Sequence, residues 1–290
     1  MNYSELLEYA KKYLMENDIA DYNSDPYLLL EYVFGITKTE YILKKTEKIS
    51  DEEKITEYKK YLEMRAAGKP LQYITGTQDF MGLTFKVNEN VLIPRYDTEI
   101  LVDEALKKIK AYDKSNISVC DMCTGSGCIG ISIAKLGKVN DVTCVDISVD
   151  ALEVAKENAS ANQVSNIGFV NSDLFTAFDE AENAVKFDFI ISNPPYIRSD
   201  EIEGLMREVR LHEPRLALDG DDDGLKFYNI ITKEAAKRLY DGGWLLYEIG
   251  CDQGNSVSEL MKKSGFVDVQ IIKDLAGLDR VVLGKKIGVE

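Results

Sequence analysis

From about Ile117 to the end of the chain, short apolar segments alternate with amphipathic helical segments. The apolar segments are ISVCDM, VTCVDI, NIGFVNSD, FDFIIS, GGWLLYEIG, VDVQIIKDL and RVVLGKK, and helical patterns separate the first six of them. This repetition predicts an α/β fold whose mostly parallel sheet is covered by helices on both faces. Only residues 276–279 join the last two segments, which is too short for a crossover. We therefore expect a seven-stranded sheet whose last strand is antiparallel.

Two different patterns precede this region. Residues 1–72 are helical in pattern and carry no catalytic constellation, so we expect an N-terminal helical bundle used for packing or for substrate docking. Residues 73–93 alternate between polar and apolar side chains and contain Gly76 and Gly82, which predicts a β-hairpin connector. The α/β domain would then occupy residues 94–290.

The charge balance limits the class of partner. The chain has 35 Lys and Arg residues against 50 Asp and Glu residues, a formal net charge of -15. An acidic surface repels phosphate backbones, so we expect no direct nucleic-acid binding and a protein or small-molecule partner. No apolar run approaches the roughly 18 residues of a membrane span, and the N-terminus does not resemble a signal peptide. We expect a cytoplasmic protein, active as a monomer.

Catalysis by a metal or by a histidine base is disfavoured by the same composition. Cys120, Cys123 and Cys128 have the spacing C-x2-C-x4-C, but no second ligand pair follows at zinc spacing. We therefore expect buried thiols and no metal. The single histidine, His212, argues against a histidine general base.

A turn of small residues closes the first apolar segment, and it consists of Cys123, Thr124, Gly125, Ser126 and Gly127. Small residues let the backbone approach a ligand closely where a strand turns into a helix whose first amides face the pocket. Taken alone, the turn is also compatible with a tight strand-to-helix connection in any α/β protein.

Acidic residues follow the next two segments. Asp146 lies roughly 20 residues after the turn, where a carboxylate can accept the hydroxyls of a ribose. Asp173 can accept an adenine amine while Leu174 or Phe175 packs against the ring. Each position alone is a weak signal, and Asp146 also fits a plain strand end. Because the carboxyl ends of parallel strands meet at one edge, the three features together predict an adenosine-shaped pocket.

The fourth segment ends in Asn193, Pro194, Pro195 and Tyr196, which we expect at the same edge. Proline fixes φ and lacks an N–H, and a residue before proline is held extended. We expect a rigid Asn193 whose side-chain carbonyl projects, neighbouring backbone carbonyls that can accept, and an aromatic face from Tyr196. Such a site suits a planar group bearing NH2. The two prolines are also explained if they only mark a loop that has no binding role.

The chemistry of a planar NH2 group narrows the choice of reaction. An amide nitrogen is a poor nucleophile because its lone pair is delocalised. Two acceptors on its hydrogens favour the positive charge that develops on nitrogen in the transition state, so no strong base is required. The other reactant must be a strong electrophile, and a sulfonium methyl donor carrying adenosine suits the predicted pocket.

These residues resemble the class I methyltransferases that use S-adenosylmethionine, and Asn-Pro-Pro-Tyr resembles their amino-methylating branch. Within that branch the chain is similar to the PrmC/HemK family, the peptide chain release factor N5-glutamine methyltransferases. The resemblance rests on the helical N-terminal domain, Ile93-Pro94-Arg95, Asp97-Thr98-Glu99, DMCTGSG, Asp146, NPPYI, and His212-Glu213-Pro214 with Leu216-Ala217-Leu218. It implies a Rossmann-like domain that transfers a methyl group from S-adenosylmethionine to the glutamine side-chain nitrogen in the Gly-Gly-Gln loop of release factors.

By this resemblance, residues 123–127 and Asp146 hold the donor, and Leu174 lies against its adenine. Asn193 contacts both donor and substrate, and residues 193–196 grip the glutamine amide. Cys123 is a departure, because relatives often have glycine there, and a positive φ would strain it. Two interpretations stay open for Arg95 and Glu99, which either orient the substrate loop or pair near a helix start. For His212-Glu213-Pro214 we favour architecture near the site over catalysis.

Other functions remain open from the sequence. An adenine amino-methyltransferase acting on DNA or RNA would use the same NH2 geometry, but it needs a basic, strand-tracking surface that the sequence does not offer. A nonenzymatic nucleotide-binding module would leave Asn193 dispensable. A nicotinamide dehydrogenase does not account for Asn-Pro-Pro-Tyr.

Overall fold

A computed structural model of the chain describes residues 1–179 and 185–288, which belong to two compact units. The first, here called the helical unit, comprises Met1–Thr77 and Met206–His212. The second, here called the sheet unit, comprises Gln78–Leu205 and Glu213–Glu290. None of the helices in the described residues is long and apolar enough to cross a membrane.

The helical unit is a set of short helices around a core of leucine and tyrosine side chains. Its helices are α1 (Tyr3–Glu16), α2 (Asp25–Phe34), α3 (Lys38–Lys44), α4 (Glu52–Ala66), α5 (Leu71–Thr75) and α9 (Arg207–His212). Asn2 accepts from the backbone of Glu5, whose side chain accepts in turn from Asn2, so both orphan amides at the start of α1 are satisfied. Leu14, Leu30 and Tyr58 are fully buried in the core.

Part of the segment that we predicted as extended is helical. The β-pattern begins at Thr77, because residues 71–75 form α5 and Gly76 ends it in the left-handed conformation, with φ 78°. Leu71 and Ile74 both pack into the core of the helical unit. Side chains three residues apart share one face of a helix but point to opposite faces of a strand, which explains the difference.

Seven strands of the described residues form one sheet, in the order β5-β4-β3-β6-β7-β9-β8. Their bounds are β3 (Ser118–Met122), β4 (Asp141–Asp146), β5 (Ile167–Asn171), β6 (Phe187–Ser192), β7 (Leu239–Glu248), β8 (Phe266–Lys273) and β9 (Asp279–Lys286). The neighbours of β9 are both antiparallel to it, whereas the other pairs are parallel. The predicted α/β class, with a mostly parallel sheet and an antiparallel last strand, is confirmed.

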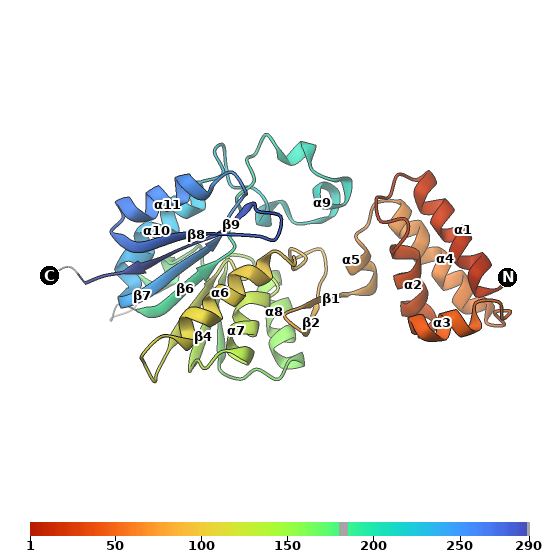
Figure 1. The fold of residues 1–290 in the computed structure, drawn as a ribbon, viewed down its shortest axis with the longest axis horizontal. Helices are drawn as coiled ribbons and strands as arrows, with labels where there is room; N and C mark the ends of the chain where they lie inside the picture. Colours follow the sequence, from red (N-terminus) through yellow and green to blue (C-terminus); the bar gives the residue numbers. More distant parts are fainter. Residues whose placement is uncertain (180–184, 289–290) are drawn as a thin grey trace. The chain divides into compact units, whose positions relative to one another are not determined.

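Helices cover both faces of this sheet (Figure 1). On one face lie α6 (Thr98–Lys110), α7 (Cys128–Leu136) and α8 (Val149–Ala161), and on the other lie α10 (Lys226–Arg238) and α11 (Gly254–Lys263). Successive strand residues alternate between the two cores, so Val119 and Leu246 pack under the first set of helices and Cys120 and Tyr247 under the second. Short 3-10 helices occupy Thr176–Phe178, Ile202–Gly204 and Arg215–Ala217.

The strand order places a binding crevice beside β3. Chain connections lead from β3 to β4 and β5 on one side, and then return across β3 to β6 and β7 on the other. In open α/β sheets, ligands bind outside the carboxyl ends of the strands where the order reverses in this way.

A separate hairpin of β1 (Thr77–Phe80) and β2 (Leu83–Lys86) is fastened to the crevice by Asn158. The buried Oδ1 of Asn158 accepts from the Lys86 amide at 2.6 Å. Its Nδ2 donates to the carbonyl of Lys86 at 3.0 Å and to that of Ser126 at 2.9 Å. One side chain of α8 therefore joins the hairpin to the turn after β3.

Candidate active site

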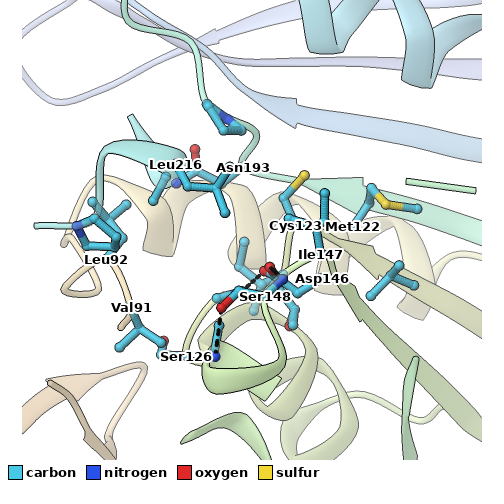
Figure 2. A pocket seen from close by; sticks show the side chains of 18 of the residues that line it. Val91, Leu92, Met122, Cys123, Ser126, Asp146, Ile147, Ser148, Asn193 and Leu216 are labelled. Atoms are coloured by element: carbon cyan, nitrogen blue, oxygen red, sulfur yellow. Dashed lines mark hydrogen bonds between the residues drawn. The ribbon is translucent and has the colours of Figure 1, made fainter. Parts of the chain in front are cut away.

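A pocket of about 380 Å³ opens at the carboxyl edge of the sheet. It is lined by residues 122–126 after β3, 145–148 after β4 and 172–174 after β5, and by Asn193 and Pro195 after β6. The rest of the lining comes from Asn90, Val91, Leu92, Pro94, Arg95, Thr98, Cys128, Ile129, Ala151, Pro214, Leu216, Ala217, Lys226, Phe227 and Ile230. Figure 2 shows Asn193 and Leu216 on one side of the pocket, and Ser126 and Asp146 on the other. The site is therefore assembled from consecutive strand ends, as the strand order requires.

The turn after β3 is held in a left-handed conformation by a buried carboxylate. The φ angles are 63° at Cys123, 54° at Gly125 and 80° at Gly127. Asp121, which is fully buried, accepts from the Thr124 hydroxyl at 2.5 Å and from the Gly130 amide at 2.9 Å. These two bonds fix both ends of the turn, and burial raises the pKa of Asp121 to about 6.

Asp146 faces the turn across the pocket floor. Its Oδ2 accepts from the Gly125 amide at 2.8 Å, and its Oδ1 accepts from the Ser148 amide at 2.9 Å. Burial raises the pKa of Asp146, and these backbone hydrogen bonds partly offset that rise. Asp173 and Leu174 also line the pocket, and Leu174 has a positive φ of 51°.

Asn193 lines the pocket at the end of β6. The preceding Ser192 is buried, and its hydroxyl donates to the carbonyl of Met122 at 2.6 Å, which ties the ends of β6 and β3 together. The Nδ2 of Asn193 donates to the Thr98 hydroxyl oxygen at 3.5 Å. The NH2 end of Asn193 is therefore held by another residue of the pocket lining, at the start of α6.

Three of the predicted site residues lie outside the pocket lining. Gly127 begins α7, where an added Cβ would approach Ile131 to 2.8 Å, so its role is close packing. Pro194 is buried, and Tyr196 packs against the core under α10 and α11. The Tyr196 carbonyl accepts from Gln253 Nε2 at 3.0 Å, which fixes the backbone of the loop.

Charged residues from the sequence motifs hold the pocket wall. Arg95 Nη2 donates to the buried Glu213 at 2.5 Å, which joins residues 94–95 to residues 214–217 of the pocket lining. Glu99 accepts from the Met81 amide at 2.6 Å and so supports the turn of the β1–β2 hairpin. His212 ends α9 in the helical unit, and burial together with neighbouring lysine and arginine charges lowers its pKa.

Sequence reasoning gave no role to several residues of this site. Val91, Leu216 and Phe227 line the pocket, and Thr98 and Glu248 lie next to the residues that follow β6. Leu216 belongs to one of the motifs that carry the resemblance, but no role followed from it, and Phe227 lies in the first turn of α10, where nothing in the sequence marks a pocket residue. Glu248 had a signal, because it is an acidic residue at the carboxyl end of a parallel strand, like Asp146.

Comparison with known proteins gives the family. Residues 5–76 match the PrmC N-terminal domain, and residues 97–222 match the Methyltransferase small domain. The Release factor glutamine methyltransferase of Clostridium acetobutylicum is 43% identical to this chain. The match covers 99% of this chain and 100% of the relative. The chain belongs to the release factor glutamine methyltransferase family. The family member of Bacillus subtilis is 36% identical over 96% of both chains.

Solved structures agree on the fold. A methyltransferase from Pyrococcus furiosus superposes with a TM-score of 0.50 at 18% identity, covering 71% of this chain and 90% of its own. The METTL16 methyltransferase domain superposes with a TM-score of 0.51 at 18% identity. This match covers 72% of this chain and 90% of the METTL16 domain. Family membership confirms the resemblance predicted from the motifs and makes the protein a methyltransferase. The alternative of a DNA or RNA adenine methyltransferase is not favoured.

Proposed function

We propose that this protein transfers a methyl group from S-adenosylmethionine to the side-chain amide nitrogen of the glutamine in the Gly-Gly-Gln loop of peptide chain release factors. The observation that carries the proposal is the pocket shared by Asn193, Asp146 and the turn after β3, in a chain whose relatives are named for this reaction.

The pocket fits the donor in size and in chemistry. Its volume of about 380 Å³ lies within the range of small-molecule sites. A Cβ added at Gly125 would meet nothing within 4 Å, so the backbone there is open to a ligand. We assign the ribose hydroxyls to Asp146, the adenine to Asp173 and Leu174, and the rest of the donor to residues 123–127. When bound, S-adenosylmethionine supplies an electrophilic methyl carbon on a sulfonium.

The remaining chemistry falls to the residues after β6. We assign the two hydrogens of the substrate amide to Asn193 Oδ1 and to the backbone carbonyl of Pro194, whose chain neighbours Asn193 and Pro195 both line the pocket although Pro194 itself does not. These two acceptors orient the substrate nitrogen and favour positive charge there. Two prolines keep this loop rigid and remove competing N–H donors. Tyr196 supports the loop from the core. As the nitrogen–carbon bond forms and the carbon–sulfur bond breaks, S-adenosylhomocysteine is the leaving group, and the methylated nitrogen releases one hydrogen to water. An N-protonated amide is strongly acidic, so no side chain needs to act as a strong base, and positioning of the two reactants supplies most of the acceleration.

We also assign roles to the parts of the chain. Residues 1–72 form the helical bundle that docks the substrate protein, residues 73–93 form the connector, and residues 94–290 form the methyltransferase domain. We propose that the protein acts as a monomer in the cytoplasm, without binding nucleic acid directly.

A methylation assay tests this function. The purified protein is incubated with radiolabelled donor and a purified release factor, and the modified residue is mapped by mass spectrometry. We expect a single added methyl group on the glutamine of the Gly-Gly-Gln loop, and no label when that glutamine is replaced by alanine. Parallel reactions contain DNA or RNA in place of the factor. Label in nucleic acid and none in the factor would overturn the proposal.

A further inference from the structure

A buried carboxylate lies behind the loop that carries Asn193. Glu248, the last residue of β7, is only 2% exposed, and its Oε1 accepts from the Tyr196 hydroxyl at 3.4 Å. Within the described part of the chain, its Oε2 has no hydrogen-bond partner. Burying a carboxylate with incomplete hydrogen bonding costs folding free energy. Such a costly group beside the substrate-binding loop calls for a functional explanation.

The hydroxyl of Thr98 is close to both Asn193 and Glu248. Thr98 is 2% exposed, its oxygen accepts from Asn193 Nδ2 at 3.5 Å, and its hydroxyl interacts favourably with the charged form of Glu248. A hydroxyl has one hydrogen, and a carboxylate can only accept. The hydrogen of Thr98 is therefore directed to Glu248, which leaves the lone pairs of Thr98 to the NH2 end of Asn193.

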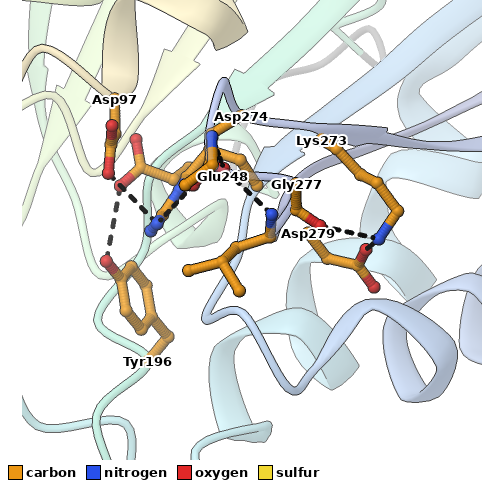
Figure 3. Close-up of polar contacts among 10 residues, drawn as sticks. Asp97, Tyr196, Glu248, Lys273, Asp274, Gly277 and Asp279 are labelled. Carbon is orange, nitrogen blue, oxygen red and sulfur yellow. Dashed lines mark hydrogen bonds and ion pairs between the residues drawn. The ribbon is translucent and has the colours of Figure 1, made fainter.

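One nearby charge, that of Arg280, supports the ionised form of Glu248. Figure 3 shows Asp97, Tyr196 and Glu248 converging from three different elements. Arg280 Nη2 lies 3.1 Å from Asp97 Oδ2 and 3.1 Å from Asp274 Oδ2. Its positive charge also favours the charged form of Glu248, against the effects of burial and of Asp97. Burial outweighs this support and raises the pKa of Glu248 to about 7, so above that pH the group is a carboxylate that can only accept.

We propose that Glu248 and Thr98 are positioning residues, which fix the direction of hydrogen bonding so that the oxygen end of Asn193 faces the pocket. The two ends of an asparagine amide have nearly the same shape, so sterics alone do not choose between them. With the NH2 end held by Thr98, the oxygen is presented to the substrate amide. This inference rests on the proposed function, because it is the substrate NH2 that requires an acceptor.

A matched pair of variants tests the role of the hydroxyl. Thr98→Val keeps the shape of the side chain and removes the acceptor, whereas Thr98→Ser keeps the acceptor. We expect kcat for release factor methylation to fall about tenfold in Thr98→Val and to stay within about twofold in Thr98→Ser. Binding of S-adenosylhomocysteine, measured by calorimetry, should stay within about twofold in both. A fully active Thr98→Val, or a Thr98→Ser as impaired as Thr98→Val, overturns the inference.

A double-mutant cycle asks whether Thr98 acts through Asn193. In the Asn193→Ala background the amide is absent, so adding Thr98→Val should lower kcat by less than about twofold. A further loss as large as the one in the wild-type background would show an effect unrelated to Asn193, and would overturn the inference.

Glu248→Gln separates positioning from folding. A glutamine amide can donate as well as accept, so the direction of the chain of hydrogen bonds is no longer fixed. We expect kcat to fall about tenfold while the midpoint of urea unfolding at pH 8 rises, because the variant no longer buries a charge. Wild-type turnover in this variant contradicts the role of Glu248. An inactive wild-type enzyme would overturn the proposed function and this inference together, whereas an active wild type with unaffected variants overturns this inference alone.

Discussion

Arg65 Nη2 lies 2.7 Å from Glu208 Oε2, inside the helical unit. Arg65 is 3% exposed, and its Nε also donates to the buried Asp25 at 2.6 Å. Glu208 belongs to α9, which the chain reaches only after the loop that carries Asn193. A few residues later the same segment contributes Leu216 to the pocket lining. The ion pair therefore fixes α9 within the helical unit.

Arg65→Met should destabilise the helical unit, because it leaves Asp25 buried without its cation. We expect a loss of about 3 kcal/mol, measured by hydrogen exchange of the amides of α2 and α4. Glu208→Gln is the control, since Glu208 is more exposed and can still accept, and it should cost less than about 1 kcal/mol. Equal protection in Arg65→Met and the wild type would contradict the structural role of this pair.

Cys123→Val should weaken donor binding. Cys123 has a φ of 63°, and a β-branched side chain is strongly disfavoured in that region. The turn can keep its shape only at a cost of about 1 to 2 kcal/mol, so we expect S-adenosylhomocysteine to bind about tenfold more weakly. Cys123→Gly should bind at least as tightly as the wild type, because glycine adopts this conformation freely. The affinity of the three proteins for S-adenosylhomocysteine is measured by calorimetric titration. If Cys123→Val binds as tightly as the wild type, the backbone at this position is not strained.

Asp146 and Asn193 should have separable effects. Asp146→Ala removes the acceptor of the Gly125 and Ser148 amides as well as the proposed ribose contact. We expect a loss of more than about tenfold in S-adenosylhomocysteine affinity, in line with a charge-assisted hydrogen bond of about 1.5 to 3 kcal/mol. Asn193→Ala should lower kcat by roughly 100-fold and affect that affinity less. Comparable turnover by Asn193→Ala would refute the amide clamp.

Glu248 should make stability depend on pH. Burial raises its pKa from 4.5 to about 7, so the folded state holds this proton more tightly than the unfolded chain does. The free energy of unfolding must therefore fall as pH rises between these two values, with the full cost present above about pH 7. Glu248→Gln should match the wild type near pH 4.5 and exceed it by roughly 3 kcal/mol at pH 8.

Fluorescence of Trp244, the single tryptophan, reports urea unfolding of the sheet unit at each pH. The exposed Asp252→Asn is the control and should follow the wild type throughout. A stability difference between Glu248→Gln and the wild type that does not grow with pH would contradict the raised pKa.

The sequence by itself determined the fold class and most of the pocket. Alternation of strands and helices requires a parallel sheet, and the carboxyl ends of parallel strands gather at one edge. For that reason Cys123, Asp146, Asp173 and Asn193, which come from four different strand ends, all line one pocket. These features depend on local periodicity and on the residue that follows each strand, and both can be read along the chain.

Tertiary structure alone decided which distant residues support those positions. Thr98 lies 95 residues from Asn193, and Glu248 lies 52 residues from Tyr196. Neither pairing follows from local pattern, because it depends on which strands are neighbours and on where α6 begins over the sheet edge. The grouping of residues 206–212 with the helical unit, and the helical turn at residues 71–75, were likewise decided by packing. Periodicity fixes which face of an element is buried, whereas the partner of that face is chosen by the free energy of the whole packed chain.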